Sequence, residues 1–286
     1  MKSTNPVFAR SEEFNGQSNA YGNQTYPGYG QAPQGGQPAY GDPSTWGTGV
    51  SNMPDVAAPE RRMTIDSVVQ KTAISLAVVM ATAFATWWYI GDVNEVTASR
   101  LYSALMIGSL GAFALSMVNS FKRVISPALV VAFAALEGVA LGALSKYFDA
   151  SFGDGIVTNA VFGTFAAFAG TLAAYKFFDI QVGDKFRRGV IAGMFGMVGL
   201  GLLSLVLSFA GIDLGFFGTG ALGLLFAVVG LVLGVFMLML DFDFVEKGVA
   251  AGLDERESWR AAFGLTVSLV WIYTNLLRIL AIFSSD

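Results

Sequence analysis

Seven long apolar runs dominate the sequence after residue 71. Each run holds 19 to 24 residues, and a helix needs about 20 to cross a hydrocarbon core of about 30 Å. A soluble helical bundle would show polar stripes of comparable width, and these runs do not. The runs therefore predict an all-α polytopic membrane protein, a bundle of seven transmembrane helices. They lie at 72–91, 101–119, 127–145, 156–174, 190–210, 217–240 and 262–283.

Composition narrows the chemistry that such a bundle can perform. Hydrophobic residues make up 54% of the chain and charged residues only 13%, against about 25% charged residues in a soluble domain. The absence of histidine and cysteine excludes disulfides, thiolate or histidine metal ligands, and Ser-His-Asp or Cys-His triads. The net charge of -4 argues against binding to nucleic acid. No nucleophile has a visible base partner, so we expect no enzyme, no catalytic residue and no bound cofactor.

Residues 1–59 differ from the rest of the chain. They hold seven of the eight prolines and are rich in glycine, tyrosine and glutamine. Such a segment has too little aliphatic surface to offset the entropy cost of ordering its backbone. We therefore expect a disordered tail, followed by the transmembrane domain at 60–286. The tail is interpreted as a plain tether, with docking through its tyrosines as the alternative.

Lysine and arginine predict the orientation in the membrane. Twelve of these residues lie in the flank before the first run and in the second, fourth and sixth links, whereas only Arg100 and Lys146 lie on the opposite side. Cytoplasmic loops carry the excess of positive charge. We expect a multi-pass protein of the cell inner (plasma) membrane, with a cytoplasmic N-terminus and with Asp286 outside.

Small residues recur at the spacing that brings membrane helices close together. Glycines four residues apart lie on one helix face and allow neighbouring backbones to approach. Packing within one bundle is the preferred interpretation over a dimer face, which favours a monomer. The pairs are Gly138 with Gly142, Gly189 with Gly193, and Gly230 with Gly234.

Two ionisable residues lie deep within the runs, where a charge is expensive and usually functional. Glu137 is about 15 Å inward from Pro127, which places it near the middle of the membrane. It either holds helices together by a buried hydrogen bond or lines a polar path. Arg278 is about 24 Å from Ala262, so it either snorkels to the outer interface or pairs with Glu137 across about 9 Å of depth.

The last run also carries a stripe of small and polar residues on one helical face. Its spacing of four, three, four and three residues predicts that this face turns inward in lipid. We expect the last helix to be central and surrounded by the other six. The stripe consists of Gly264, Ser268, Trp271, Asn275 and Arg278.

Three acids, Asp241, Asp243 and Glu246, bunch where the sixth run reaches the cytoplasm. A cluster of carboxylates at a pore mouth would attract cations through its negative charge. It would also titrate with pH, because repulsion between neighbouring carboxylates raises the pKa of one of them. The alternative is an ordinary solvated helix end. Acids at a helix C-terminus interact unfavourably with the helix dipole, which counts slightly against that alternative.

Three stretches resemble the Bax inhibitor-1 family, specifically a bacterial branch with an extended N-terminus. They are NPVFARSEEF at 5–14, ISPALVVAFAALEGVALGALS at 125–145, and the segments from LDFDFVEKGV to LLRILA at 240–281. The resemblance implies a seven-helix bundle with a central last helix. It also implies a pH-sensitive calcium leak that is gated by hydrogen-bonded aspartates on helices six and seven.

The resemblance carries over to individual residues only in part. Glu137 matches the third-helix glutamate, Arg278 the last-helix arginine, and Asp241 or Asp243 the sixth-helix aspartate. The seventh-helix aspartate should fall at 265–268, which contains no acid. If gating survives, we expect Asp241 to pair with Asp243, Glu246, the acids at 254–257 or Arg278.

The sequence thus predicts a Bax inhibitor-1-like membrane protein that conducts calcium or other cations in a pH-sensitive way. Calcium would be the transported ion and would contact Asp241 and Asp243. The alternatives are a non-conducting regulator that binds a membrane protease or stress-response partners, and a proton-coupled exporter. The ion path and gate are assigned to Glu137, Asp241, Asp243, Glu246, Asn275 and Arg278.

Overall fold

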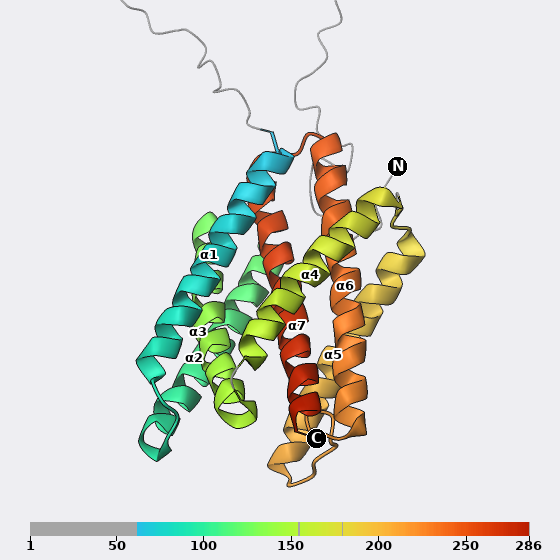
Figure 1. The fold of residues 1–286 in the computed structure, drawn as a ribbon. Coiled ribbons are helices and arrows are strands. Elements are labelled where there is room, and N and C mark those ends of the chain that lie inside the picture. The colour runs from blue at the N-terminus through green and yellow to red at the C-terminus, as the bar shows by residue number, and fades with distance from the viewer. Residues whose placement is uncertain (1–61, 154, 179, 286) are drawn as a thin grey trace, which may run out of the picture. The chain divides into compact units, whose positions relative to one another are not determined.

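The computed structural model describes residues 62–153, 155–178 and 180–285, and within these ranges the chain forms seven α-helices and no strand. Each helix is long and apolar enough to cross a membrane, as the sequence predicts. The predicted tail at 1–59 and Asp286 lie outside the described residues. The helices are α1 (Ile65–Ile90), α2 (Glu95–Phe121), α3 (Pro127–Phe152), α4 (Ile156–Phe177), α5 (Asp184–Phe209), α6 (Ala221–Ala250) and α7 (Glu257–Ser284), as Figure 1 shows.

Local sequence signals define several helix ends. Thr64 and Asn94 cap α1 and α2, because each side chain accepts hydrogen bonds from backbone N–H groups of the first turn. Pro127 occupies the first turn of α3, where its missing N–H costs nothing. Helix α6 continues ten residues beyond its apolar run to Ala250. Asp241, Asp243 and Glu246 are therefore helical residues, with α6 continuing beyond them.

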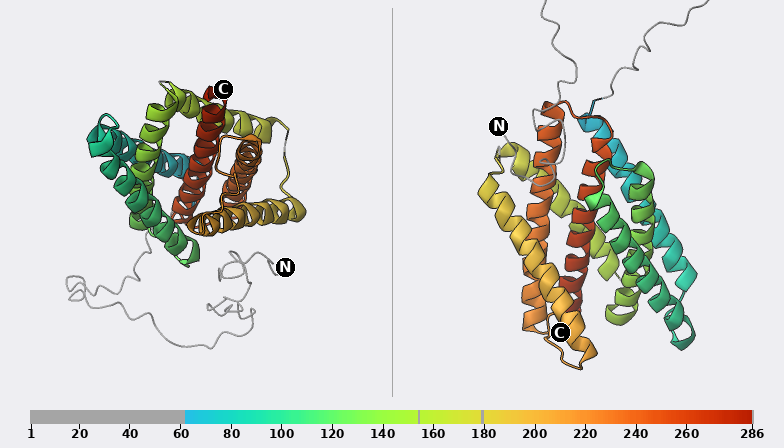
Figure 2. Two further views of the ribbon diagram at one scale, coloured as in Figure 1. Left: turned by 90° about the horizontal axis from the view of Figure 1, so that it is seen from below. Right: turned by 180° about the vertical axis from the view of Figure 1, so that it is seen from behind.

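Helix α7 lies at the centre of the bundle, as predicted, and packs against α1, α3, α4 and α6. The prediction that all six other helices surround it is wrong. Helix α2 packs on α3 and α1, and among the described helices α5 packs only on α6, so both form an outer layer (Figure 2). Few side chains of α2 and α5 are buried, which follows from each having one main helical neighbour.

Two of the three glycine pairs pack helices within the chain. A side chain at Gly138 or Gly142 would collide with the α1 backbone at Val79 or Ala83. A side chain at Gly230 or Gly234 would collide with side chains of α7, those of Asn275, Trp271 and Ile272. Gly193 contacts Leu233 of α6, but Gly189 faces open space. Close packing of α3 on α1 and of α6 on α7 thus depends on glycines, which supports the preferred interpretation.

The start of α1 is fastened to the link between α6 and α7. Met63 donates a backbone hydrogen bond to Leu253 at 2.7 Å, and the Lys71 ammonium is 3.1 Å from a carboxylate oxygen of Glu255. We call this end of the bundle, with the α2–α3, α4–α5 and α6–α7 links, the basic end. Arg100 and Lys146 lie at the opposite end, where they contact aromatic rings.

Candidate functional site

The polar stripe of α7 faces α6 along most of its length. Near the basic end, Ser268 Oγ donates a hydrogen bond to Asp241 Oδ2 of α6 at 2.5 Å. Gly264 makes room for this carboxylate, since a Cβ there would lie 2.8 Å from Asp241 Oδ1. Ser268 is fully buried and Asp241 is half-buried, so the bond is made inside the bundle. We call it the Asp241–Ser268 latch.

The latch corrects the predicted partners of Asp241. We expected Asp243, Glu246, the acids at 254–257 or Arg278, whereas the structure places a seventh-helix hydroxyl there. Ser268 is the last residue of the stretch 265–268, where an aspartate was expected. A serine hydroxyl can donate to a carboxylate whatever the charge of that carboxylate, so it joins α6 to α7 without a second acid.

Asp243 takes part in a separate ion cluster on the other side of α6. Its carboxylate is 2.7 Å from the Arg187 guanidinium of α5 and 2.7 Å from the Lys247 ammonium one helical turn away. The Asp243 side chain is only 4% exposed, whereas Lys247 is 59% exposed. Arg187 therefore supplies the more shielded of the two charges that stabilise this carboxylate.

The three acids of the predicted cluster face three different helices. Asp241 bonds to α7, Asp243 to α5, and Glu246 accepts a hydrogen bond from Tyr175 Oη of α4 at 2.7 Å. Successive residues of a helix point about 100° apart, so acids at these spacings diverge. The structure does not bring Asp241 and Asp243 together as one gate. Instead, Asp241 joins α6 to α7, and Asp243 joins α6 to α5.

The acids at 254–257 also have other partners. Glu255 pairs with Lys71 of α1. Glu257 pairs with Arg260 at 2.7 Å. Asp254 Oδ1 accepts from the backbone N–H of Arg256 at 2.7 Å. These contacts stabilise the α6–α7 link. None of these acids pairs with Asp241, whose partner is Ser268.

Further along the stripe, two side chains approach the glycines of α6. Trp271 Nε1 donates to the carbonyl oxygen of Gly230 at 2.8 Å. Asn275 donates from Nδ2 to the Trp271 carbonyl, and its Oδ1 lies where a side chain at Gly230 would be. Asn275 is 5% exposed and contributes polar atoms to the middle of the α6–α7 interface.

Arg278 and Glu137 are not paired. Arg278 donates to the carbonyl oxygen of Phe216 at 2.6 Å and lies over the rings of Phe217 and Phe226 in the segment around the start of α6. Among the described residues Glu137 has no ion pair and no hydrogen bond of its side chain. It is half-buried on α3, one turn from Phe133, which packs against Phe263 of α7. Of the two alternatives for Arg278, the structure does not show the pairing with Glu137, and the guanidinium donates to the Phe216 carbonyl instead.

No group of three or more acids that could hold a metal ion occurs within the described ranges. The Asp241 carboxylate has a hydroxyl partner and that of Asp243 has two cations. A resident calcium ion on this pair would have to displace these contacts.

Comparison with known proteins identifies the family. The family model described as Bax inhibitor 1 like matches residues 5–285, nearly the whole chain. The chain belongs to the Bax inhibitor 1-like family. A search of curated proteins found no match. The match agrees with the resemblance carried by the residues around Glu137 and by the segment at 240–281.

In this Bax inhibitor 1-like chain, the sequence predicted the face of α7 that turns inward. It did not predict that Ser268 on this face bonds to Asp241. The stripe places Ser268 on the same face as Asn275 and Arg278, which is the signal that could have found it. A search for a second acid overlooked a hydroxyl. Arg187 was counted only as one of the charges that set the orientation, although it pairs with the most buried aspartate of the described residues.

Proposed function

We propose that this Bax inhibitor 1-like membrane protein is a pH-sensitive leak for calcium or related cations, closed at rest by the Asp241–Ser268 latch. The observation that carries the proposal is the hydrogen bond between a half-buried carboxylate of α6 and a buried hydroxyl of the central helix. The proposed setting is the inner membrane, with the basic end in the cytoplasm, because positive charge favours that side.

Carboxylates at successive depths support a path for cations. Glu137 lies near the middle of α3, and Asp241 lies nearer the basic end on α6. Ionisable groups at membrane depth are expensive and usually mark ion or proton pathways. Calcium prefers oxygen ligands, and carboxylates supply them. In this proposal Glu137, which has no hydrogen bond or ion pair among the described residues, is the mid-path carboxylate.

The latch supplies a reason for closure and for a response to pH. An ionised Asp241 only accepts hydrogen bonds, whereas a protonated one also carries a proton that it can donate. Protonation therefore weakens the contact that joins α6 to α7, because Ser268 then donates to a neutral carboxyl group and the charge assistance of the bond is lost. The nearby charged groups on α6 and α5 are Asp243, Lys247 and Arg187, and they form their own cluster. Asp241 is thus the acid whose protonation acts on the α6–α7 contact directly.

Flux measurements across a range of pH test the proposal. The full chain is reconstituted into vesicles that contain a calcium-sensitive dye, and calcium entry is followed after its external addition. Asp241→Asn should flatten the pH dependence, because an amide does not titrate, and Glu137→Gln should slow entry. Glu95→Gln, an exposed acid at the opposite end, is the matched control and should behave as the unchanged chain.

Two results would count against this function. Unchanged flux in both Asp241→Asn and Glu137→Gln would remove these residues from the path. An absence of calcium entry at every pH, with an added calcium ionophore still filling the vesicles, would contradict a leak and favour a non-conducting regulator.

A further inference from the structure

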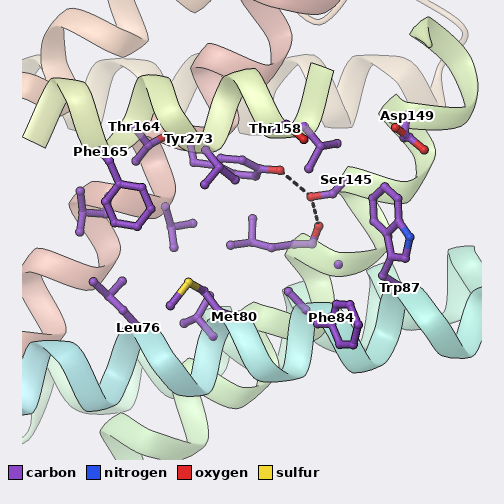
Figure 3. A pocket seen from close by; sticks show the side chains of 18 residues that line it. Leu76, Met80, Phe84, Trp87, Ser145, Asp149, Thr158, Thr164, Phe165 and Tyr273 are labelled. Atoms are coloured by element: carbon purple, nitrogen blue, oxygen red, sulfur yellow. Dashed lines mark hydrogen bonds between the residues drawn. The ribbon is translucent and has the colours of Figure 1, made fainter. Parts of the chain in front are cut away.

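A cavity of about 470 Å³ lies among α1, α3, α4 and α7, and neither Asp241 nor Ser268 lines it. Figure 3 shows its side chains converging from these helices. We call it the lateral slot. It is lined by side chains from residues 76–87 of α1, 141–149 of α3, 157–165 of α4 and 269–273 of α7.

The lateral slot opens toward the space that lipid occupies. Helices α1 and α4 flank it, and each packs on α3 and α7, but within the described residues they do not pack on each other. Met80 and Phe84 of α1 are 53% and 72% exposed at this opening, and Phe165 of α4 is 49% exposed. Because α1 and α4 both span the membrane, hydrocarbon lies at the opening.

The length of the slot matches one leaflet of a bilayer. On α1 it runs from Leu76, near the middle of the helix, to Trp87, close to its end. The eleven helical steps between them correspond to about 16 Å, and half of a hydrocarbon core is about 15 Å. A linear chain that enters from one leaflet would therefore fit its whole length.

The hydroxyls on the floor of the slot are already satisfied. Ser145 Oγ donates to the Leu141 carbonyl oxygen at 2.6 Å, so its contact with Tyr273 Oη, also 2.6 Å, uses the tyrosine proton. Thr164 donates to the Ala160 carbonyl at 2.7 Å. None of these three hydroxyls has a proton left for a ligand, and most of the remaining lining is aliphatic or aromatic. The deep part of the slot thus suits hydrocarbon.

Two opposite charges lie at the shallow end. Asp149 lines the slot there, and Lys146 lies one turn earlier on α3 with its ammonium 4.6 Å from the Trp87 ring centre. Neither has an ion-pair partner among the described residues. Tryptophan at this depth is typical of the membrane interface, where phospholipid headgroups lie. A phosphate and an amine would complement Lys146 and Asp149 respectively.

We propose that the lateral slot binds one acyl chain of a zwitterionic phospholipid from the leaflet at the opposite end to the basic end. The phosphate contacts Lys146 and the amine contacts Asp149. Ser145 and Tyr273 form the floor against which the acyl chain packs. The binding is independent of ion conduction.

Photolabelling of the full chain in vesicles tests this site. The probe is a phosphatidylethanolamine with a diazirine midway along one acyl chain. Peptides that contain Ser145 or Tyr273 should be labelled, although these side chains are only 6% and 8% exposed and ordinary boundary lipid does not reach them. Val161→Trp, which fills the opening, should abolish this labelling. Phe162→Trp is the matched control, since Phe162 is 69% exposed on the next residue and does not line the slot.

Equal floor labelling in Val161→Trp and Phe162→Trp, or none in the unchanged chain while Phe162 is labelled, would overturn the proposal. Unlabelled phosphatidylethanolamine should compete better than diacylglycerol, which lacks the headgroup. That difference should disappear in a Lys146→Gln, Asp149→Asn double variant, and its absence in the unchanged chain would refute the headgroup contacts.

Because the chain has no cysteine, Met80→Cys also tests for a second copy in the slot. Disulfide-linked dimers across this position would contradict a lipid occupant.

Discussion

Removal of the Arg187 charge should destabilise the bundle more than removal of the Lys247 charge, although both contact Asp243. The Asp243 side chain is 4% exposed and Arg187 is 22% exposed, so this pair is shielded from water. A hydrogen bond to a charged group contributes about 1.5–3 kcal/mol, and we expect Arg187→Gln to lower the free energy of unfolding by that amount. Lys247 is 59% exposed, which places Lys247→Gln in the range of about 0–1 kcal/mol measured for surface pairs.

The assay is a double-mutant cycle of Arg187→Gln and Asp243→Asn. Unfolding in mixed detergent and denaturant is followed by circular dichroism, and the coupling energy is the departure from additivity. Arg188→Gln is the matched control, since Arg188 is an exposed neighbour with no ion pair among the described residues, and it should change stability by no more than about 0.5 kcal/mol. The reasoning is refuted if Arg187→Gln behaves as Arg188→Gln does, or if Lys247→Gln is the costlier change.

Two further predictions concern helix packing. Gly138→Ala should cost about 1–3 kcal/mol in the same unfolding assay, because its Cβ would collide with Thr82 and the Val79 carbonyl of α1. Gly170→Ala on α4 meets nothing within 4 Å and should instead stabilise by about 0.5–1 kcal/mol; equal effects would contradict close packing at α1. Trp271→Phe should cost about 0.5–1.5 kcal/mol through the lost bond to the Gly230 carbonyl, and an unchanged unfolding free energy would argue against that bond.

The transmembrane architecture could be predicted from the sequence because length and apolarity alone decide whether a helix can span a membrane. The inward face of α7 could also be predicted, since a polar stripe in lipid must turn toward protein. The number of helices that contact α7 could not be predicted, because glycines indicate where another helix approaches but not which helix it is. In the folded bundle Gly138 meets α1 and Gly230 meets α7, and the sequence does not distinguish these partners.

The candidate site was less accessible to sequence reasoning. Proximity in sequence suggested that Asp241 and Asp243 act together, but the helical turn sends one to Ser268 and the other to Arg187. The depth of Arg278 allowed a pairing with Glu137, yet its guanidinium donates to the Phe216 carbonyl in the α5–α6 link. Such carbonyls leave no mark in a sequence. Ser268 stands in the stretch where an acid was expected, and this is visible in the sequence. Its bond to Asp241 is not visible there, because it depends on which helix Ser268 faces.

The proposed closure by the Asp241–Ser268 latch is tested most directly by the initial rate of calcium entry in Ser268→Ala against Thr266→Ala. Both side chains are fully buried on α7, but within the described part of the chain the Thr266 hydroxyl bonds only to Ala262 of its own helix. Loss of a bond worth about 1.5–3 kcal/mol shifts a closed-to-open equilibrium by roughly 10- to 150-fold. We predict faster entry in Ser268→Ala, up to that factor, and an unchanged rate in Thr266→Ala. Equal rates in the two variants would contradict the account.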